Sequence, residues 1–468
     1  MPEEPSESHA AAPPSRPRSR PRRTRVPRVR PPFSDVPGPF ARRERLDTTL
    51  EGMPTPEQDR GMRAFWWDGF WANVPETVLV SYLGLYVIAF GGSNAQVGLA
   101  AAAGSLFAAL AFFPGAWFVE KYGRRKQIVL ATGGGLARVA LLGLVFVPFV
   151  AEGDAAIWLV IGLICARGFF GYFAIPAWTS MTADVVPIGM RGRYFASRNF
   201  GMSVAALITL PLAGFALDRV GGLEAWQVVW LGACAAAALS TWAFARIPDV
   251  RPHADVIAET RTSPRRGVLA ELLSDRNMVM YLLGTAIFNI ALTAAGPFFN
   301  VYLKENLDAS ALWIGVLNAL PAVTGLAGLV YFGRLMDERG TKWMLVVSGL
   351  LIPILPASWL VVTEPWHIVP INVAGGVMWA GYQLALLNMT MVMAPPESRA
   401  RYAAAFHMVL FASAFAGPLL GGALIGAIGY KFVFGFSAIG RLAGTLVVWR
   451  FVSGSFERRG VAPTPAAA

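Results

Sequence analysis

The chain has 468 residues, of which 55% are apolar and only 15% charged, and its mean hydropathy is +0.49. A soluble protein of this length would divide into several cores with more charged surface, so this composition indicates a membrane-spanning protein. The formal charge of +11 does not indicate a nucleic-acid partner, because much of it lies in the first 64 residues and in loops on one side of the predicted membrane.

Residues 1–64 are rich in Pro, Arg, Ser and Ala, with eight arginines between Arg16 and Arg30 and no apolar periodicity. Such a segment buries too little apolar surface to offset its chain entropy, so we expect a disordered tail. Its arginines suit attachment to anionic lipid headgroups of the bilayer. The alternative is a solvated tail that mainly holds the N-terminus inside.

Twelve apolar runs follow, each long enough to cross a hydrocarbon core about 30 Å thick. The first six, within residues 65–245, are Trp66–Phe90, Gln96–Val119, Ile128–Phe149, Ala156–Met181, Tyr194–Leu217 and Trp226–Ala245. The second six, within residues 278–452, are Met278–Leu303, Leu312–Phe332, Trp343–Val362, Trp366–Met389, Tyr402–Ala427 and Phe432–Val452. A polar linker, residues 246–277, separates the two sets and contains a predicted interfacial helix, Gly267–Asp275; residues 453–468 form a second tail.

Basic residues gather in the loops that follow the even-numbered spans. They are Lys121, Arg124, Arg125, Lys126, Arg191, Arg193, Arg334, Arg339, Lys342, Arg399 and Arg401. The opposite loops hold only Arg219, Lys304 and Lys431. This asymmetry places both termini and the linker in the cytoplasm, as expected for a multi-pass protein of the inner cell membrane.

Two pairs of loops repeat between the sets. In the first pair, FVEKYGRRKQ (Phe118–Gln127) and RLMDERGTKW (Arg334–Trp343), an acid is followed three residues later by Gly and then by cationic residues. The second pair, Arg191–Phe200 and Arg399–Met408, is related by a shift of 208 residues. Matching loops at matching places indicate a duplicated six-helix unit, from which many secondary transporters build a central site.

On these motifs the chain resembles the major facilitator superfamily of secondary transporters over nearly all of residues 66–452. The first loop is similar to that family's cytoplasmic signature, although Glu120 replaces the usual Asp and Ala116 stands at the leading Gly. The resemblance implies an all-α membrane protein with twelve transmembrane helices in two pseudo-symmetric halves, working by alternating access.

The resemblance also implies a gate, in which these loop residues contact neighbouring helix ends in one conformation and release them in the other. The residues assigned to this gate are Glu120, Gly123, Arg124, Arg125, Asp337 and Gly340, with Asp184, Arg191 and Arg193 as candidate partners. Carboxylates near helix N-termini and arginines near C-terminal ends are each favourable by roughly 0.3 to 1 kcal/mol. The alternative is that these residues only fix the topology.

Glu76 is the only acid that we expect deep within a span, ~15 Å beyond Trp66. It shares a helical face with Asn73 and Thr77, and a helix at this position lines the cavity in the resembled family. A charged group at such depth is costly and calls for a partner or a task. Low dielectric favours the neutral carboxyl, which suits Glu76 to load and release a proton. The alternative is a structural acid near the inner end of its helix.

Arg167, followed by Gly171, resembles a second family signature in which the arginine is tied to proton coupling, although Phe170 replaces the expected Gln. Arg167 would stabilise ionised Glu76 if the two met across the cavity; a packing role is the equal alternative. Arg138 and Arg441 are also deep, on helices that are peripheral in the resembled fold, and we expect structural pairing for both.

The second set of spans offers neutral polar side chains that suit a sugar-like or amphiphilic organic substrate. The candidates are Asn289, Asn300, Asn372, Trp379 and Gln383, complemented by Trp178 of the fourth span. Interhelical polar contacts are the alternative for each of them.

No nucleophile-base set, phosphate loop or metal cluster stands out, so we expect no enzyme activity and no cofactor beyond a proton as coupling ion. Cys165 and Cys234 lie in apolar runs without metal or disulfide spacing and are expected to be buried free thiols. The sequence therefore predicts proton-coupled transport of a small organic solute. An uncoupled facilitator, and a non-transporting protein that binds or assembles pigments or lipids on the same fold, stay open.

Overall fold

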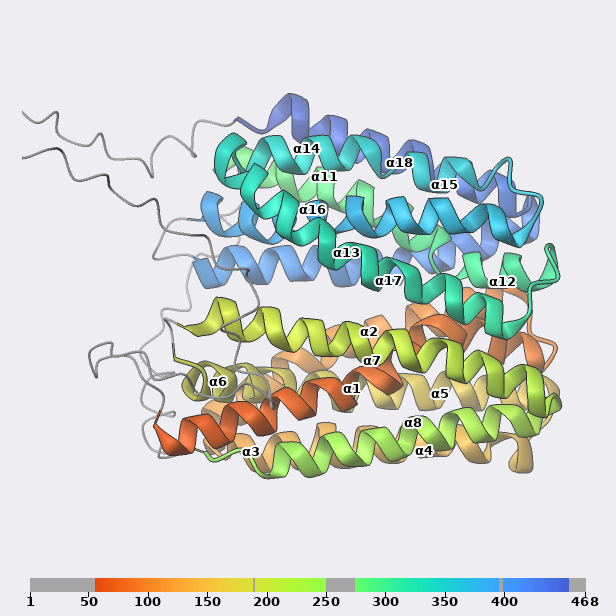
Figure 1. Cartoon of the computed structure of the whole chain (residues 1–468), viewed down its shortest axis with the longest axis horizontal. Coiled ribbons are helices and arrows are strands. Elements are labelled where there is room, and N and C mark those ends of the chain that lie inside the picture. Colours follow the sequence, from red (N-terminus) through yellow and green to blue (C-terminus); the bar gives the residue numbers. More distant parts are fainter. Residues whose placement is uncertain (1–54, 188–189, 250–273, 395–398, 454–468) are drawn as a thin grey trace, which may run out of the picture.

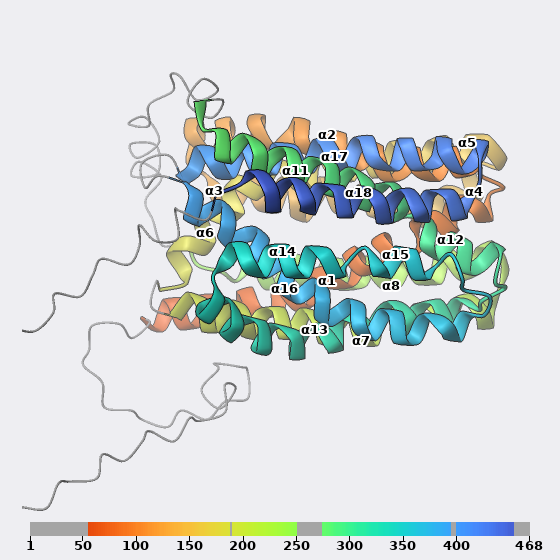
Figure 2. The same ribbon diagram turned by 90° about the horizontal axis from the view of Figure 1, so that it is seen from above.

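The computed structural model describes residues 55–187, 190–249, 274–394 and 399–453, and these residues form helices and no strand. The helices run side by side along the long axis of the molecule (Figures 1 and 2), and they form two groups, one above the other in Figure 1. The first group contains α1 (Pro56–Ala89), α2 (Asn94–Tyr122), α3 (Arg125–Ile128), η1 (Val129–Leu136), α4 (Ala137–Val150), α5 (Gly153–Phe173), α6 (Ile175–Val185), α7 (Arg191–Val220) and α8 (Gly222–Ala245). The second contains α11 (Arg276–Ala295), α12 (Phe298–Glu305), α13 (Ala311–Arg339), α14 (Thr341–Leu351), α15 (Ile354–Ser358), η3 (Pro365–His367), α16 (Ile368–Met393), α17 (Arg399–Ala427) and α18 (Tyr430–Phe451).

Within the described ranges, eleven helices or consecutive helix pairs are long and apolar enough to cross a membrane. The remaining long helix, α16, has 26 residues and carries Asn372, Gln383 and Asn388, which lower its apolar character. It packs against α13 and α14 and supplies the remaining span, which is the tenth in chain order. Large apolar side chains such as Phe149, Val150 and Ile439 are 70–73% exposed on the bundle, as expected for a surface that faces lipid. The prediction of an all-α membrane protein is confirmed.

Helix α1 begins ten residues before the predicted first span. Its N-cap is Thr55, whose side chain accepts a hydrogen bond from the Gln58 N–H while the Gln58 side chain accepts from the Thr55 N–H. This capping box starts the helix at Pro56, so residues 56–64, which the sequence assigned to the tail, are helical. Residues 1–54, the tail beyond 453, and nearly all of the predicted interfacial helix Gly267–Asp275 lie outside the described residues.

Several spans are built from two helices because the chain is interrupted inside the bundle. The fourth span breaks at Ala174, two residues before Pro176, and the seventh breaks at Gly296–Pro297. The third contains the π-helix η1, which includes Gly133–Gly135. Proline lacks an N–H donor, and π-helical turns often mark functional sites, so these breaks fall where bending and binding are expected.

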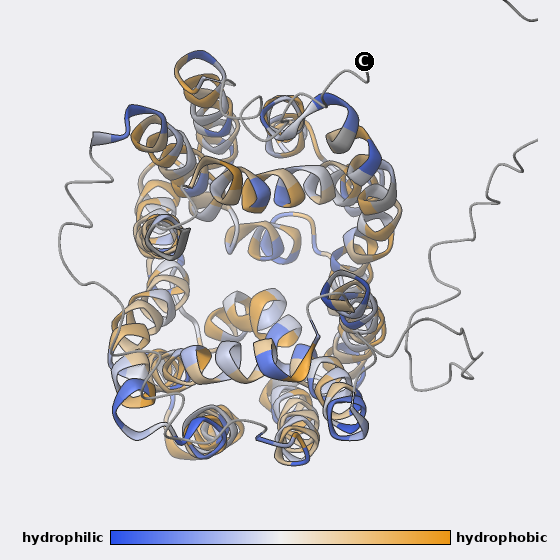
Figure 3. Ribbon diagram, turned by 90° about the vertical axis from the view of Figure 1, so that its left-hand side faces the viewer, coloured by the Kyte–Doolittle hydropathy of each residue, from blue (hydrophilic) through white to orange (hydrophobic). Residues whose placement is uncertain are grey.

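The two halves meet mainly where α2 packs along α17 and α7 packs along α13. We call the end where α8 stops at Ala245 and α11 starts at Arg276 the linker end, and the other the opposite end. Viewed from the linker end, the two groups of helices face each other across the middle of the molecule (Figure 3). Near the opposite end the contact is close, because a Cβ on Gly98 of α2 would overlap the carbonyl oxygen of Pro418 in α17.

Candidate functional site

A charged pair joins α1 to α5 in the first half. The Arg167 Nη2 contacts the Glu76 Oε1, which is the pairing that the sequence suggested. The Arg167 side chain is 13% exposed and the Glu76 side chain is 51% exposed. The carboxylate is therefore held by a shielded arginine and remains open on its other side.

This pair lies on the wall of a cavity of about 340 Å³ inside the first half. Helices α1, α4 to α8 and the π-helix η1 surround it. Its polar lining consists of Asp68, Glu76, Arg138, Arg167, Tyr172, Trp178, Arg198, Ser240 and Thr241. The glycines of η1 bring that helix close to its neighbours, since a Cβ on Gly134 would lie 2.9 Å from Cγ2 of Thr241.

A second acid, Asp68, lines the same cavity, so the expectation that Glu76 is the only deep acid is wrong. Asp68 is 6% exposed, accepts a 2.8 Å hydrogen bond from the Ser240 hydroxyl, and has Oδ2 3.8 Å from Nη2 of Arg198. The Arg198 guanidinium lies over the Phe65 ring at 4.6 Å and donates to the Phe65 carbonyl at 3.3 Å. A capping signal was present in the sequence, because the Thr55 capping box starts the helix at Pro56 and places Asp68 about 18 Å from that start.

Arg138 also faces the cavity, where its Nη2 is 3.5 Å from the Ser240 hydroxyl oxygen. Its Nε has no hydrogen-bond partner within the described part of the chain. Structural pairing was expected for Arg138, and Ser240 is the contact that the structure provides. The cavity thus combines three arginines with two carboxylates and carries one excess positive charge.

Three predicted polar residues are bound to backbone away from this lining. Asn73 donates to the Met202 carbonyl of α7 at 2.7 Å, and Thr77 donates to the Asn73 carbonyl at 2.9 Å. Asn289 donates to the Thr285 carbonyl of its own helix at 3.0 Å. Gln383 is exposed and lines none of the described cavities.

The other predicted residues of the second half gather around a separate cavity of about 310 Å³. Asn300, Asn372 and Trp379 line it together with Arg441. Trp178, which was expected to complement them, lines the cavity of the first half instead. The predicted substrate residues are therefore divided between two cavities, one in each half.

Arg125 connects the first basic loop to two neighbouring helix ends. Its side chain is fully buried and donates to the Asp184 carboxylate at 2.5 Å, to the Ser180 hydroxyl at 3.0 Å and to the Asp249 carboxylate at 2.7 Å. Asp184 closes the fourth span and Asp249 follows α8, so one guanidinium ties three segments together. Asp184 was among the expected partners, whereas Asp249 was not anticipated.

The remaining gate residues occupy corresponding places in the two halves. Gly123 and Gly340 have φ values of 63° and 91°, a conformation that favours glycine, and each donates to the carbonyl at the end of the preceding helix.

Arg191 donates to the carbonyls of Ala183 and Val186 at the end of α6. Glu120 and Arg124 flank Gly123, and Arg193 is exposed in the first turn of α7. Asp337 belongs to α13, and its side chain lies outside the described part.

Hydrogen bonds join the halves at the opposite end, at residues that the sequence did not single out. The two carboxylate oxygens of Asp218, in the last turn of α7, accept from the Ala311 N–H at 2.9 Å and the Leu312 N–H at 2.7 Å. The Tyr82 hydroxyl of α1 lies 2.8 Å from the Leu210 carbonyl and 3.2 Å from the Ala311 carbonyl. These contacts close the bundle at this end.

The chain is similar over most of its length to proteins that are named as multidrug resistance or efflux proteins. The chain is 23% identical over 385 residues to "Multidrug resistance protein MdtG" of Dickeya zeae, covering 80% of this chain and 90% of that protein. It is 23% identical over 387 residues to "Multi-drug resistance efflux pump PmrA" of Streptococcus pneumoniae, covering 80% and 91%.

Two solved structures share the fold at 13% identity: a POT family transporter in complex with 5-aminolevulinic acid (TM-score 0.66, covering 86% of this chain and 97% of that one) and a D-xylose-proton symporter (TM-score 0.64, covering 83% and 97%). The sequence profile of the Major Facilitator Superfamily matches residues 67–409 and 281–467. Since these matches span both halves, the chain is a multi-pass membrane transporter and belongs to the Major Facilitator Superfamily.

Proposed function

We propose that this transporter exports small organic solutes in exchange for protons, with Glu76 as the proton-binding group. The observation that carries the proposal is the Glu76–Arg167 pair on the wall of the first cavity. Arginine keeps its proton under all physiological conditions, so the proposed proton binds to the glutamate of this pair. A proton on Glu76 removes the attraction to Arg167, and loss of the proton restores it.

The cavity around the pair is large enough for a small solute and contains apolar as well as charged walls. At about 340 Å³ it falls in the usual range for small-molecule sites. Trp178 and Tyr172 supply aromatic surface, while Glu76 is the half-exposed carboxylate. A solute that competes with the proton for this carboxylate would couple the two fluxes, since each binds best to one state of the pair.

The proposed direction of transport and the proposed orientation in the membrane rest on the distribution of basic loop residues and on the names of the relatives. The basic loops named above lie at the linker end, which we place in the cytoplasm of the cell, together with both termini. The relatives whose names describe multidrug resistance and efflux support export from that side. We propose that the arginine-rich segment before residue 64 meets anionic headgroups of the inner leaflet, because arginines near the membrane surface are attracted to them.

The test is transport in everted membrane vesicles with a cationic dye as solute and an imposed proton gradient. Glu76→Gln should abolish gradient-driven uptake while leaving exchange of dye down its own gradient measurable. Glu57→Gln, which removes an exposed acid from the first turn of the same helix, is the matched control and should behave like the wild type. If Glu76→Gln keeps full gradient-driven uptake with unchanged pH dependence, Glu76 is not the proton site. Counterflow without proton movement in the wild-type protein would instead identify an uncoupled facilitator.

A further inference from the structure

Arg441 of α18 is a buried cation without an acid beside it. Its exposed fraction is 2%, and neither Nε nor Nη2 has a hydrogen-bond partner among the described residues. No described carboxylate lies within ion-pair distance of it, so the structural pairing that its sequence position suggested is absent from the described structure. A buried unpaired charge is costly, and such positions are kept where a ligand supplies the missing partner.

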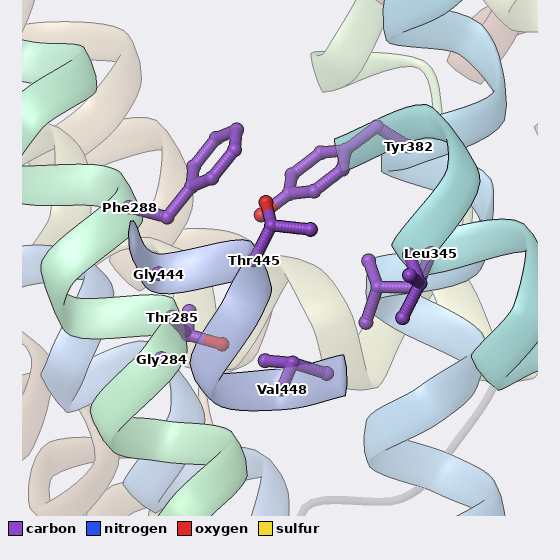
Figure 4. A pocket seen from close by; sticks show the side chains of 9 residues that line it. Gly284, Thr285, Phe288, Leu345, Tyr382, Gly444, Thr445 and Val448 are labelled. Atoms are coloured by element: carbon purple, nitrogen blue, oxygen red, sulfur yellow. The ribbon is translucent and has the colours of Figure 1, made fainter. Parts of the chain in front are cut away.

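The chain is tightly packed on one side of this arginine. One turn further along α18, Gly444 and Thr445 fit against Gly284 of α11 and beside Tyr382 of α16 (Figure 4). A Cβ on Gly284 would lie 2.8 Å from the Gly444 carbonyl oxygen, and the void left at this crossing is only about 10 Å³. That is at the limit for one water molecule, so no ligand fits there.

On the other side Arg441 lines the cavity of about 310 Å³ in the second half. The polar side chains around it are three asparagines and two tryptophans: Asn300, Asn318, Asn372, Trp359 and Trp379. Each asparagine already uses its NH₂ group, toward the Ser81 carbonyl, the Asn300 side chain and the Leu317 carbonyl respectively. No acid belongs to the described lining, so the guanidinium is the charge that a ligand would meet.

We propose that this cavity binds a small organic monoanion, a carboxylate on a flat apolar body, with Arg441 as its counter-charge. A guanidinium forms strong charge-assisted hydrogen bonds with a carboxylate, and Nη1 is the nitrogen left for this contact because Nε and Nη2 of Arg441 are buried. Phe299, Trp359 and Trp379 supply aromatic walls for the body of the ligand. A single arginine balances a single negative charge. The site lies apart from the Glu76–Arg167 cavity, and binding there does not depend on the proposed proton coupling.

The experiment uses the full-length protein in phosphatidylcholine nanodiscs and titrates benzoate, with chloride as the inorganic comparison, by intrinsic tryptophan fluorescence and calorimetry. Benzoate should bind saturably and raise the thermal unfolding temperature as its concentration increases. Arg441→Gln should weaken binding at least tenfold, while Arg450→Gln, an exposed arginine on the same helix, should leave it unchanged. Equal binding to wild-type protein and Arg441→Gln, or saturable binding of chloride without benzoate, would overturn the proposal.

A second variant covers the case in which Arg441→Gln fails to fold. Asn372→Asp places a carboxylate on the wall of the same cavity and leaves Arg441 in place. The internal carboxylate should compete with benzoate and weaken its binding at least tenfold, with the unfolding temperature showing that the variant is folded. A folded Asn372→Asp variant that binds benzoate like the wild type would also overturn the proposal.

Discussion

Asp218 caps a helix that belongs to the other half of the molecule. Its two oxygens accept the N–H groups of Ala311 and Leu312, while Ser310 accepts the next one, from Trp313 at 3.1 Å. The first three N–H groups of α13 are therefore satisfied, two of them from across the interface. Because transport requires the opposite end to open, the Asp218 contacts must break in the other conformation. We predict that Asp218→Ala increases the population that is open at this end.

The size of the effect follows from the geometry. Replacing an N-cap acid by alanine costs roughly 0.5–2 kcal/mol. Asp218 is exposed, so water can replace part of what is lost, which favours the lower half of this range. A loss of about 0.5–1 kcal/mol from the closed state alone raises the ratio of open to closed molecules about two- to fivefold. Asp218→Asn keeps one acceptor oxygen and should shift the ratio less, since Asn caps helices about as well as Asp.

The assay is a spin-label distance measurement across the opposite end. Labels at Glu224 and Lys431, exposed in the first turns of α8 and α18, report the separation of the halves in a background where Cys165 and Cys234 are replaced by alanine. The long-distance population should grow in the order wild type, Asp218→Asn, Asp218→Ala. An unchanged distribution in the alanine variant, or an equal shift in both variants, would refute the reasoning.

Three further predictions concern packing and buried charge. Asp68→Asn leaves the buried Arg198 without its acid and should destabilise the protein by about 3–5 kcal/mol in thermal unfolding. Asp59→Asn removes the acid of the surface pair with Arg63 and should cost about 1 kcal/mol or less. Equal effects of the two substitutions would contradict the buried pairing. Gly98→Ala should force α2 away from α17 and raise the open population in the spin-label assay, while Gly162→Ala, with open space around it, should not. An unchanged distance distribution in Gly98→Ala would show that close packing at Gly98 does not hold this end closed. Arg125→Lys cannot reach two carboxylates and a hydroxyl at once and should lose about 1–3 kcal/mol; an unchanged unfolding temperature would show that the bridges contribute little.

The features that sequence predicted well are those whose meaning is local. Apolar runs set the spans, because a helix must satisfy its own backbone in lipid. The acid-Gly-basic loops predicted a repeated unit, and Gly123 and Gly340 do both adopt positive φ, a conformation that favours glycine. The Glu76–Arg167 pair was also predicted, because pairing lowers the cost of placing two opposite charges at similar depth on cavity-lining helices.

The features that sequence missed depend on tertiary contacts or on an overlooked helix start. Asp68 was not singled out, because the first helix was begun at Trp66 instead of Pro56 and its contacts with Ser240 and Arg198 are tertiary. Asp218 has no local signal, since its partners lie more than ninety residues away in the other half. Arg441 was expected to find an internal partner, and only the packed structure shows the cavity beside it.

Helix α1 connects the Glu76–Arg167 pair to the closed end. Glu76 and Tyr82 are six residues apart on α1, about 9 Å along its axis, and the Tyr82 hydroxyl bonds to the Ala311 carbonyl in the other half. Pro75 directly precedes Glu76 and has no N–H to give to the carbonyl one turn earlier, so α1 bends most easily there. In the proposed coupling, a protonated Glu76 would release Arg167 and free the segment beyond Pro75, which carries Tyr82, to tilt. The proposed change of charge in the first cavity would therefore reach the interface that must open through a single helix, α1.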